Sequence, residues 1–273
     1  MRPGAAPSIV ALIGLLASPG CRPVPEAPED LDGLLHYFWR NVVDGGDDEI
    51  AQGVVNLNQA VDGEGLSEIA DGQVTSLTAD EVAWLDLDRQ VDPAEASGIH
   101  MVSPLTCDLE TVDDIVTALE QGEMYDTFDA YERQYTSDAA DYHDRSVPTL
   151  TWTVEYSVTV PLAGSYTANL DAGARWVPSQ GDTLSPFGPV LVTWSTLPEP
   201  AVFDGGDGVF DQDYRVEVYH EPEPGLVVHT EALWRYMEAG VVSMSNEDIQ
   251  RMVLNGFADW DEQTMVLCES GEY

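Results

Sequence analysis

The strongest constraint on the fold is a change of hydrophobic period at Thr149. Before this residue, apolar side chains recur at helical spacing, whereas after it they alternate with polar ones. A period of two is typical of a strand that buries one face and leaves the other in water. We therefore expect long antiparallel strands over 149–160 and 165–177, joined by a turn over 161–164.

More strands and a final helix are predicted downstream. Runs of β-branched and aromatic residues predict strands over 190–196, 201–203, 213–220 and 226–237. Ser245 and Asp248 then begin a long helix in the manner of a capping box. Its apolar face is expected to consist of Ile249, Met252, Val253, Gly256, Phe257, Trp260 and Leu267.

The last two strands carry a group of charged residues around a hairpin. If residues 221–225 form its loop, Glu217 faces His229 and Arg215 faces Glu231 across the ladder. Such a patch is either acid–base machinery or a solvated face with paired charges, and we favour the solvated face.

The first half of the chain is mostly helical by pattern. Helices are expected over 31–42 and 50–61, a short one from Thr78 to Leu85, and another that begins at Asp108. A loop is expected over 62–76 and a strand over 98–105. A further amphipathic stretch at helical spacing places Met124, Phe128, Tyr131 and Tyr135 on one stripe.

Strand, helices, antiparallel strands and a long last helix, from Gly98 to Cys268, form an order that resembles the helix-grip architecture of the START and polyketide-cyclase-like superfamily. The resemblance implies an α+β fold in which a curved antiparallel sheet wraps the last helix over 98–273. It also implies a hydrophobic ligand between sheet and helix. The aromatic residues expected at this site are Trp152, Tyr156, Trp194, Trp234, Phe257 and Trp260. The alternative is a core filled by these rings.

The N-terminus is typical of an exported protein. Arg2, an apolar core and a small residue before Cys21 resemble the signal of a bacterial lipoprotein. This resemblance predicts a signal over 1–21, lipid on Cys21 as the membrane contact, and a position in the cell envelope, with the outer membrane favoured. An ordinary secretory signal is the alternative. The Pro-rich residues 22–29 would tether the chain, and 30–97 would form a separate helical segment.

Charge excludes several classes of function. The chain has 50 acidic residues and ten basic ones, all Arg, for a formal net charge of -40. Nucleic acid and anionic head groups repel such a chain. The absence of Lys excludes a P-loop lysine and Schiff-base chemistry. With 44% hydrophobic residues, the chain can nevertheless bury a sizeable core.

The cysteines form an even pair if Cys21 carries lipid. Cys107 and Cys268 would then meet in an oxidising compartment, and we expect a disulfide. The alternative is two buried free thiols.

No metal, cofactor or catalytic residue is predicted. The acidic run from Asp204 to Asp213 and the one from Asp44 to Glu49 miss the spacing of calcium loops, so turn chemistry is the better interpretation. His36 is expected to have a structural role, and no pair of His lies within a helical turn, as zinc binding would require.

Three functions are compatible with the sequence. The leading hypothesis is a lipid-anchored envelope protein that binds an apolar small molecule or an envelope partner and is not an enzyme. The others are a cyclase- or hydrolase-type enzyme that uses the same cavity, and a structural or interaction protein with a solid core.

Overall fold

The fold is described by a computed structural model of the 273-residue chain. The structure describes residues 26–63, 66–125, 128–160, 164–179, 187–204, 208–238 and 246–271. The expected signal and Cys21 lie outside these residues. Within them, no helix has the length and apolar character needed to cross a bilayer.

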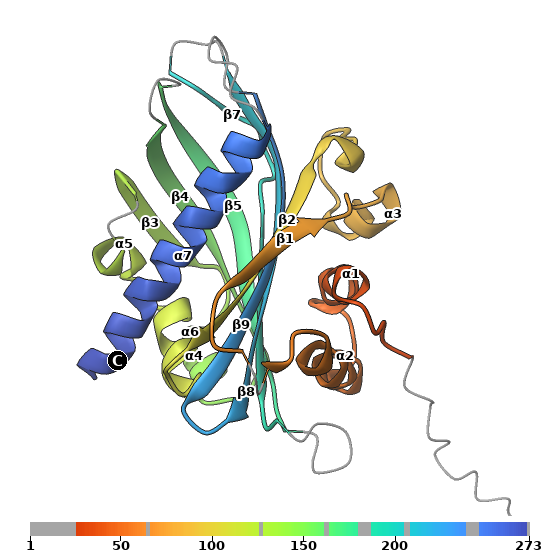
Figure 1. The fold of residues 1–273 in the computed structure, drawn as a ribbon. Helices are drawn as coiled ribbons and strands as arrows, with labels where there is room; N and C mark the ends of the chain where they lie inside the picture. Colours follow the sequence, from red (N-terminus) through yellow and green to blue (C-terminus); the bar gives the residue numbers. More distant parts are fainter. Residues whose placement is uncertain are drawn as a thin grey trace, which may run out of the picture.

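One large antiparallel sheet organises the molecule (Figure 1). Its spatial order is β1-β2-β9-β8-β6-β5-β4-β3, and a short β7 pairs with β8. The strands are β1 (Ala70–Val74), β2 (Ser97–Leu105), β3 (Ala130–Tyr135), β4 (Thr149–Val160), β5 (Gly164–Val177), β6 (Val190–Thr196), β7 (Ala201–Val202), β8 (Val209–Glu223) and β9 (Leu226–Glu238). The strands predicted from β4 onward, and β2, are confirmed.

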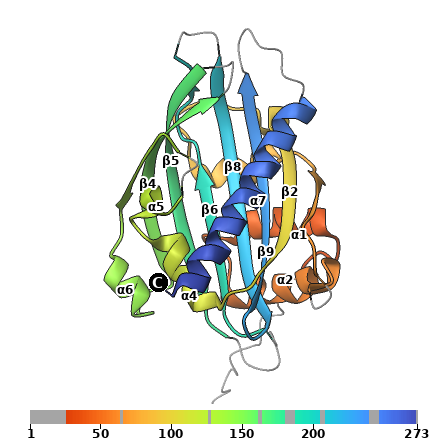
Figure 2. The ribbon, with the colours of Figure 1, turned by 60° about the vertical axis from the view of Figure 1, so that its left-hand side comes forward.

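Helices cover both faces of the sheet (Figures 1 and 2). The outer face carries α1 (Leu31–Asn41), α2 (Asp47–Ala60) and α3 (Ala79–Val82), and the inner face carries α4 (Leu109–Thr117), α5 (Gln121–Met124), α6 (Ala139–His143) and α7 (Asn246–Ser270). The expected α+β helix-grip architecture is confirmed, with α7 running across the curved inner face.

The outer face is a dense apolar layer. Trp39 of α1 packs against Tyr214 of β8 and Trp234 of β9, with ring centroids 5.9 and 6.1 Å apart. All three side chains are fully buried. Burial of one such large side chain contributes about 2 to 3 kcal/mol, so this layer holds the N-terminal helices to the sheet.

Two expected elements differ from the structure. Residues 130–135 form strand β3 and not part of a helical stripe, and they pair with β4 from Ala130↔Ser157 to Tyr135↔Trp152. Burial alternates along β3, because Tyr131, Arg133 and Tyr135 point inward. Strand β1 lies within the expected loop over 62–76 and pairs with β2, so the segment 30–97 contributes an edge to the same sheet.

A disulfide fixes the C-terminal end of α7. Cys268, in the last turns of α7, is bonded to Cys107, which lies between β2 and α4, with Cα atoms 5.7 Å apart. The expected disulfide pair is therefore present in the structure.

Candidate ligand-binding cavity

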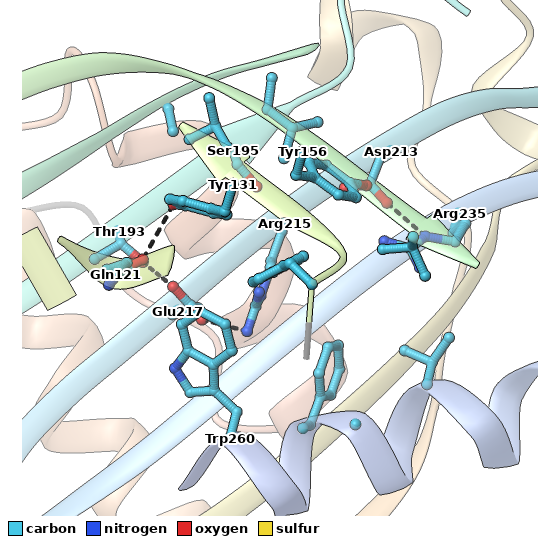
Figure 3. A pocket seen from close by; sticks show the side chains of 18 of the residues that line it. Gln121, Tyr131, Tyr156, Thr193, Ser195, Asp213, Arg215, Glu217, Arg235 and Trp260 are labelled. Carbon is cyan, nitrogen blue, oxygen red and sulfur yellow. Dashed lines mark hydrogen bonds and ion pairs between the residues drawn. The ribbon is translucent and has the colours of Figure 1, made fainter. Parts of the chain in front are cut away.

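A cavity of about 300 Å³ lies between the inner face of the sheet and α7. Its wall comes from β3, β4, β5, β6, β8 and β9 on one side and from α7 on the other, and Figure 3 shows it from close by. This volume is at the lower end of the range of small-molecule sites.

The α7 wall follows helical periodicity. The α7 residues that line the cavity share one face of the helix, and they are Met252, Val253, Gly256, Phe257 and Trp260. A Cβ added at Gly256 would meet no heavy atom within 4 Å, so this position leaves open space in the wall.

Trp260 is held in place by Tyr125, which is itself hydrogen-bonded to α7. Its ring stacks on Tyr125, with centroids 3.7 Å apart and planes 11° apart. The Tyr125 hydroxyl in turn lies 2.8 Å from Thr264 Oγ1, one turn further along α7. The position of this rigid aromatic plane is therefore set before any ligand arrives.

Strands β3 and β4 supply the opposite aromatic wall. Trp152 and Tyr156 of β4 are buried and line the cavity together with Tyr131 of β3. The guanidinium of Arg133 lies over the Trp152 ring, 4.4 Å from its centroid. Among the described residues, Trp152 Nε1 is one of the buried polar atoms without a hydrogen-bond partner.

The six aromatic residues predicted to bind ligand divide between the two faces. The structure brings Trp152, Tyr156, Phe257 and Trp260 together around the cavity. Trp194 borders the cavity between its neighbours on β6, but its ring packs over Gly173 in the outer layer.

Trp234 does not line the cavity, which corrects its expected position. Its side chain belongs to the outer layer, and its Nε1 donates to the carbonyl of Thr75 at 2.7 Å. His36 packs edge-on against it with ring centroids 5.4 Å apart and also lies 2.9 Å from Glu81, in the structural role expected of this histidine. The Trp234 ring points to the outer face because successive side chains of β9 point to opposite faces of the sheet, and its neighbour Arg235 points to the cavity.

A strip of charged residues crosses the inner face under α7. Asp213 and Arg235 form an ion pair with an Oδ2–Nε distance of 2.6 Å. Arg215 lies between Glu217 and Glu231, 2.5 and 2.7 Å from their carboxylate oxygens. Figure 3 shows the first pair, and Arg215 with Glu217, pointing into the cavity.

Behind this strip, a second set of polar groups connects the sheet to α7. His229 Nδ1 lies 2.9 Å from Asp261 Oδ1, and Ser103 of β2 donates a hydrogen bond to the other oxygen of the same carboxylate. His229, Asp261 and Ser103 are all buried. This set fixes the central part of α7 against β2 and β9.

Burial and neighbouring charges shift the protonation of this set in known directions. Burial alone would lower the pKa of His229, but the carboxylate of Asp261, with Glu231 and Glu217, outweighs burial and raises that pKa to about 9. Burial raises the pKa of Glu231 to about 7, against the opposing effects of Arg215 and His229. His229 is therefore a cation at neutral pH, and Glu231 holds a proton part of the time.

Two features of the predicted charged patch are corrected. The interpretation as a solvated face is wrong, because Glu231 and His229 are almost completely buried under α7. The expected register is also shifted, since Glu217 pairs with Glu231 and Tyr219 with His229. The hairpin turn is tighter than expected, with Glu223 paired to Leu226, and this moves the ladder by two residues.

Two clusters of potential metal ligands lie among the described residues, and a guanidinium group already occupies each of them, although Glu231 Oε1 and His229 Nε2 have no hydrogen-bond partner. Glu217, His229 and Glu231 place one ligand atom each within 4.8 Å of one another, but the Arg215 guanidinium already lies against both carboxylates. The other such group contains Asp113, which is paired with Arg145 at 2.7 Å. Both oxygens of Glu217 are engaged, one by Arg215 and the other by the Thr193 hydroxyl.

Comparison with known proteins gives a structural likeness only. No family model and no curated protein matches the sequence. A START superfamily protein from Mycobacterium smegmatis matches with a TM-score of 0.42 and 9% identity, covering 63% of this chain and 97% of that one. Human StAR-related lipid transfer protein 5 matches with a TM-score of 0.46 and 7% identity, covering 83% and 96%.

The fold resembles that of START-superfamily structures. A STAR-related lipid transfer protein from Xanthomonas axonopodis also matches, with a TM-score of 0.41 and 12% identity, covering 66% of this chain and 90% of that one. The predicted order of elements is seen in the structure itself, in the antiparallel sheet and the long last helix. At these identities and scores, the likeness concerns the arrangement of elements alone.

Proposed function

We propose that the protein binds an apolar small molecule in the cavity between the sheet and α7. The observation that carries this proposal is the cavity itself, because a solid core would have filled the space next to Gly256. Aromatic rings on opposite walls, Trp152 and Trp260 among them, provide flat apolar surface for such a ligand.

The test blocks the cavity from α7 without touching the sheet. In Gly256→Phe, the new ring enters the open space beside Phe257 and Trp260, and we expect the binding of Nile red, an uncharged apolar dye, to be lost. Asn255→Phe is the matched control, because Asn255 is the neighbouring position on the exposed side of α7. Nile red that binds Gly256→Phe as well as wild type would count against the cavity as the site.

We propose further that the chain is exported and anchored in the cell envelope by lipid on Cys21. The support is the order of a positive start, an apolar core and a small residue before Cys21, followed by a Pro-rich stretch. Intact-mass measurement of protein extracted from its own membrane should give a chain that begins at Cys21 and carries acyl groups. Cys21→Ala should lose the acyl mass, and a variant that keeps the same acyl mass would rule out Cys21 as the site of this anchor.

A further inference from the structure

The positive side chains in the described cavity wall are already neutralised or fully used. Arg235 is paired with Asp213, and Arg215 is paired with both Glu217 and Glu231. The pairs of Arg235 with Asp213 and of Arg215 with Glu231 join β8 to β9, and Arg215 and Glu217 both lie on β8, so the fold itself supplies each cation with its carboxylate.

The third guanidinium, that of Arg133, is committed to the end of a helix. Its Nη1 donates to the carbonyls of Val116 and Ala118, at 2.7 and 2.9 Å, where α4 ends. Its Nε and Nη2 donate to the Tyr131 hydroxyl, and Nη2 also donates to Gln121 Oε1. Cations at this position offset the negative end of the helix dipole.

The formal charges in and directly behind the cavity wall balance. Arg133, Arg215 and Arg235 line the cavity together with Asp213 and Glu217, and Glu231 lies behind them against Arg215. A charged ligand head that is placed against the inner wall, away from solvent, would add an uncompensated charge there. Such a charge costs several kcal/mol unless a partner is available for it.

The outside of the molecule adds a further bias against anions. The formal net charge of -40 repels an anionic lipid during its approach and attracts a cationic one. A cation drawn to the surface would still find the carboxylates of the cavity occupied by Arg215 and Arg235.

We infer that the cavity selects an uncharged amphiphile, such as a long-chain alcohol or ester, over an anionic or cationic lipid with the same chain. This inference rests on the proposed function and names the class of ligand that the same cavity accepts. The internally paired guanidinium and carboxylate groups act as a filter for charge, and the aromatic walls supply the affinity.

The test uses three probes that share one chain and differ only in the charge of the head. Dodecanol, dodecanoate and dodecylamine are titrated at neutral pH, below their micelle concentrations, against Nile red bound to the wild-type protein. We expect dodecanol to bind about tenfold more tightly than either charged probe, or more. A smaller preference, or a charged probe that binds more tightly, overturns the inference.

Reciprocal variants test whether the paired charges cause the selection. Asp213→Asn leaves Arg235 without its carboxylate and should shift the preference about tenfold towards dodecanoate, whereas Arg235→Gln should shift it towards dodecylamine. If Asp213→Asn does not fold, Glu217→Gln removes a less buried carboxylate and should act in the same direction. Unchanged selectivity in the folded variants overturns the inference.

The outcomes separate this inference from the proposed function. If neither Nile red nor any dodecyl probe binds wild type, both fail. If Nile red binds but the three heads are accepted equally, the cavity is a binding site and only the charge filter fails.

Discussion

His229 and Asp261 form an ion pair beneath α7, with Nδ1 2.9 Å from Oδ1, although both side chains are almost fully removed from water. The pair joins β9 to the middle of α7, close to the wall of the cavity. The contact is an ion pair only while His229 is protonated, so its contribution to stability depends on pH.

Stability should fall as pH rises through the pKa of His229. The pKa is 6.5 for an ordinary histidine and about 9 in the folded chain, so the stabilisation is complete below pH 6.5 and lost as pH passes 9. This shift of the His229 pKa corresponds to up to about 3 kcal/mol of stabilisation. Glu231, with a pKa raised to about 7, loses its contribution in the same direction between pH 4.5 and 7. Urea unfolding from pH 7 to pH 9 should show the decrease.

Unfolding measured above pH 6.5 is also free of an opposing pH dependence that comes from His220. Burial lowers the pKa of His220 to about 4, so this residue destabilises the fold as pH falls below 6.5. An unfolding free energy that stays constant or rises between pH 7 and pH 9 would contradict the role of His229.

Asp261→Asn should remove most of this pH dependence. The variant leaves His229 without its main counter-ion, so the pKa of His229 should fall, and the free energy of unfolding near pH 6 should drop by about 3 to 5 kcal/mol. NMR titration of the His229 ring measures the pKa directly. Glu262→Gln is the matched control, since Glu262 is exposed on the neighbouring position of α7. An unshifted His229 pKa in Asp261→Asn would refute the pairing.

Loss of the Cys107–Cys268 disulfide should lower stability markedly. The bond closes a loop with a sequence separation of 161, for which the chain-entropy model gives about 5 kcal/mol as an upper value. Thermal melts with and without reductant should differ by many degrees for wild type. The double variant Cys107→Ser, Cys268→Ser should melt at the lower temperature in both conditions. A wild-type melt that ignores reductant would mean that the thiols are free in solution.

Gly256→Ala should stabilise the protein by about 1 kcal/mol, because alanine has the higher helix propensity and the added methyl meets no atom within 4 Å. Chemical denaturation measures the change. A loss of stability would mean that the space next to Gly256 is smaller than the structure indicates.

Gly173→Ala should be destabilising by about 1 to 3 kcal/mol, since a Cβ at Gly173 collides with the Trp194 ring across the β5–β6 ladder. The double variant Gly173→Ala, Trp194→Leu should recover part of the loss relative to Trp194→Leu alone. Equal costs of Gly173→Ala in both backgrounds would contradict the close packing of these two residues.

Periodicity made much of the fold predictable, and its exceptions have physical causes. The alternating runs predicted β4 and β5 because one side of each strand is consistently apolar. Strand β1 was missed because its sequence, ADGQV, buries only Val74 and is recognisable only through its pairing with β2. Strand β3 was mistaken because Tyr131 and Tyr135 fit a helical stripe as well as an alternating one.

The cavity was predictable in its location but not in its polar content. Alternation along β8 correctly separates Asp213, Arg215 and Glu217 from the apolar face, but it cannot tell that α7 covers the charged face. Asp261 and Ser103 are 158 residues apart, so no local pattern could connect them. The parity of Trp234 relative to Arg235 was the available signal that its ring points away from the cavity.

Strand β8 carries incompatible chemistries on its two sides, ion pairs towards α7 and large rings and aliphatic groups towards α1. Insertion or deletion of a single residue in this strand would exchange the sides and drive three charges into the tryptophan layer. The binding properties of this scaffold can therefore change through replacement of individual side chains, whereas a one-residue change in the length of β8 between Gln212 and His220 should be strongly destabilising.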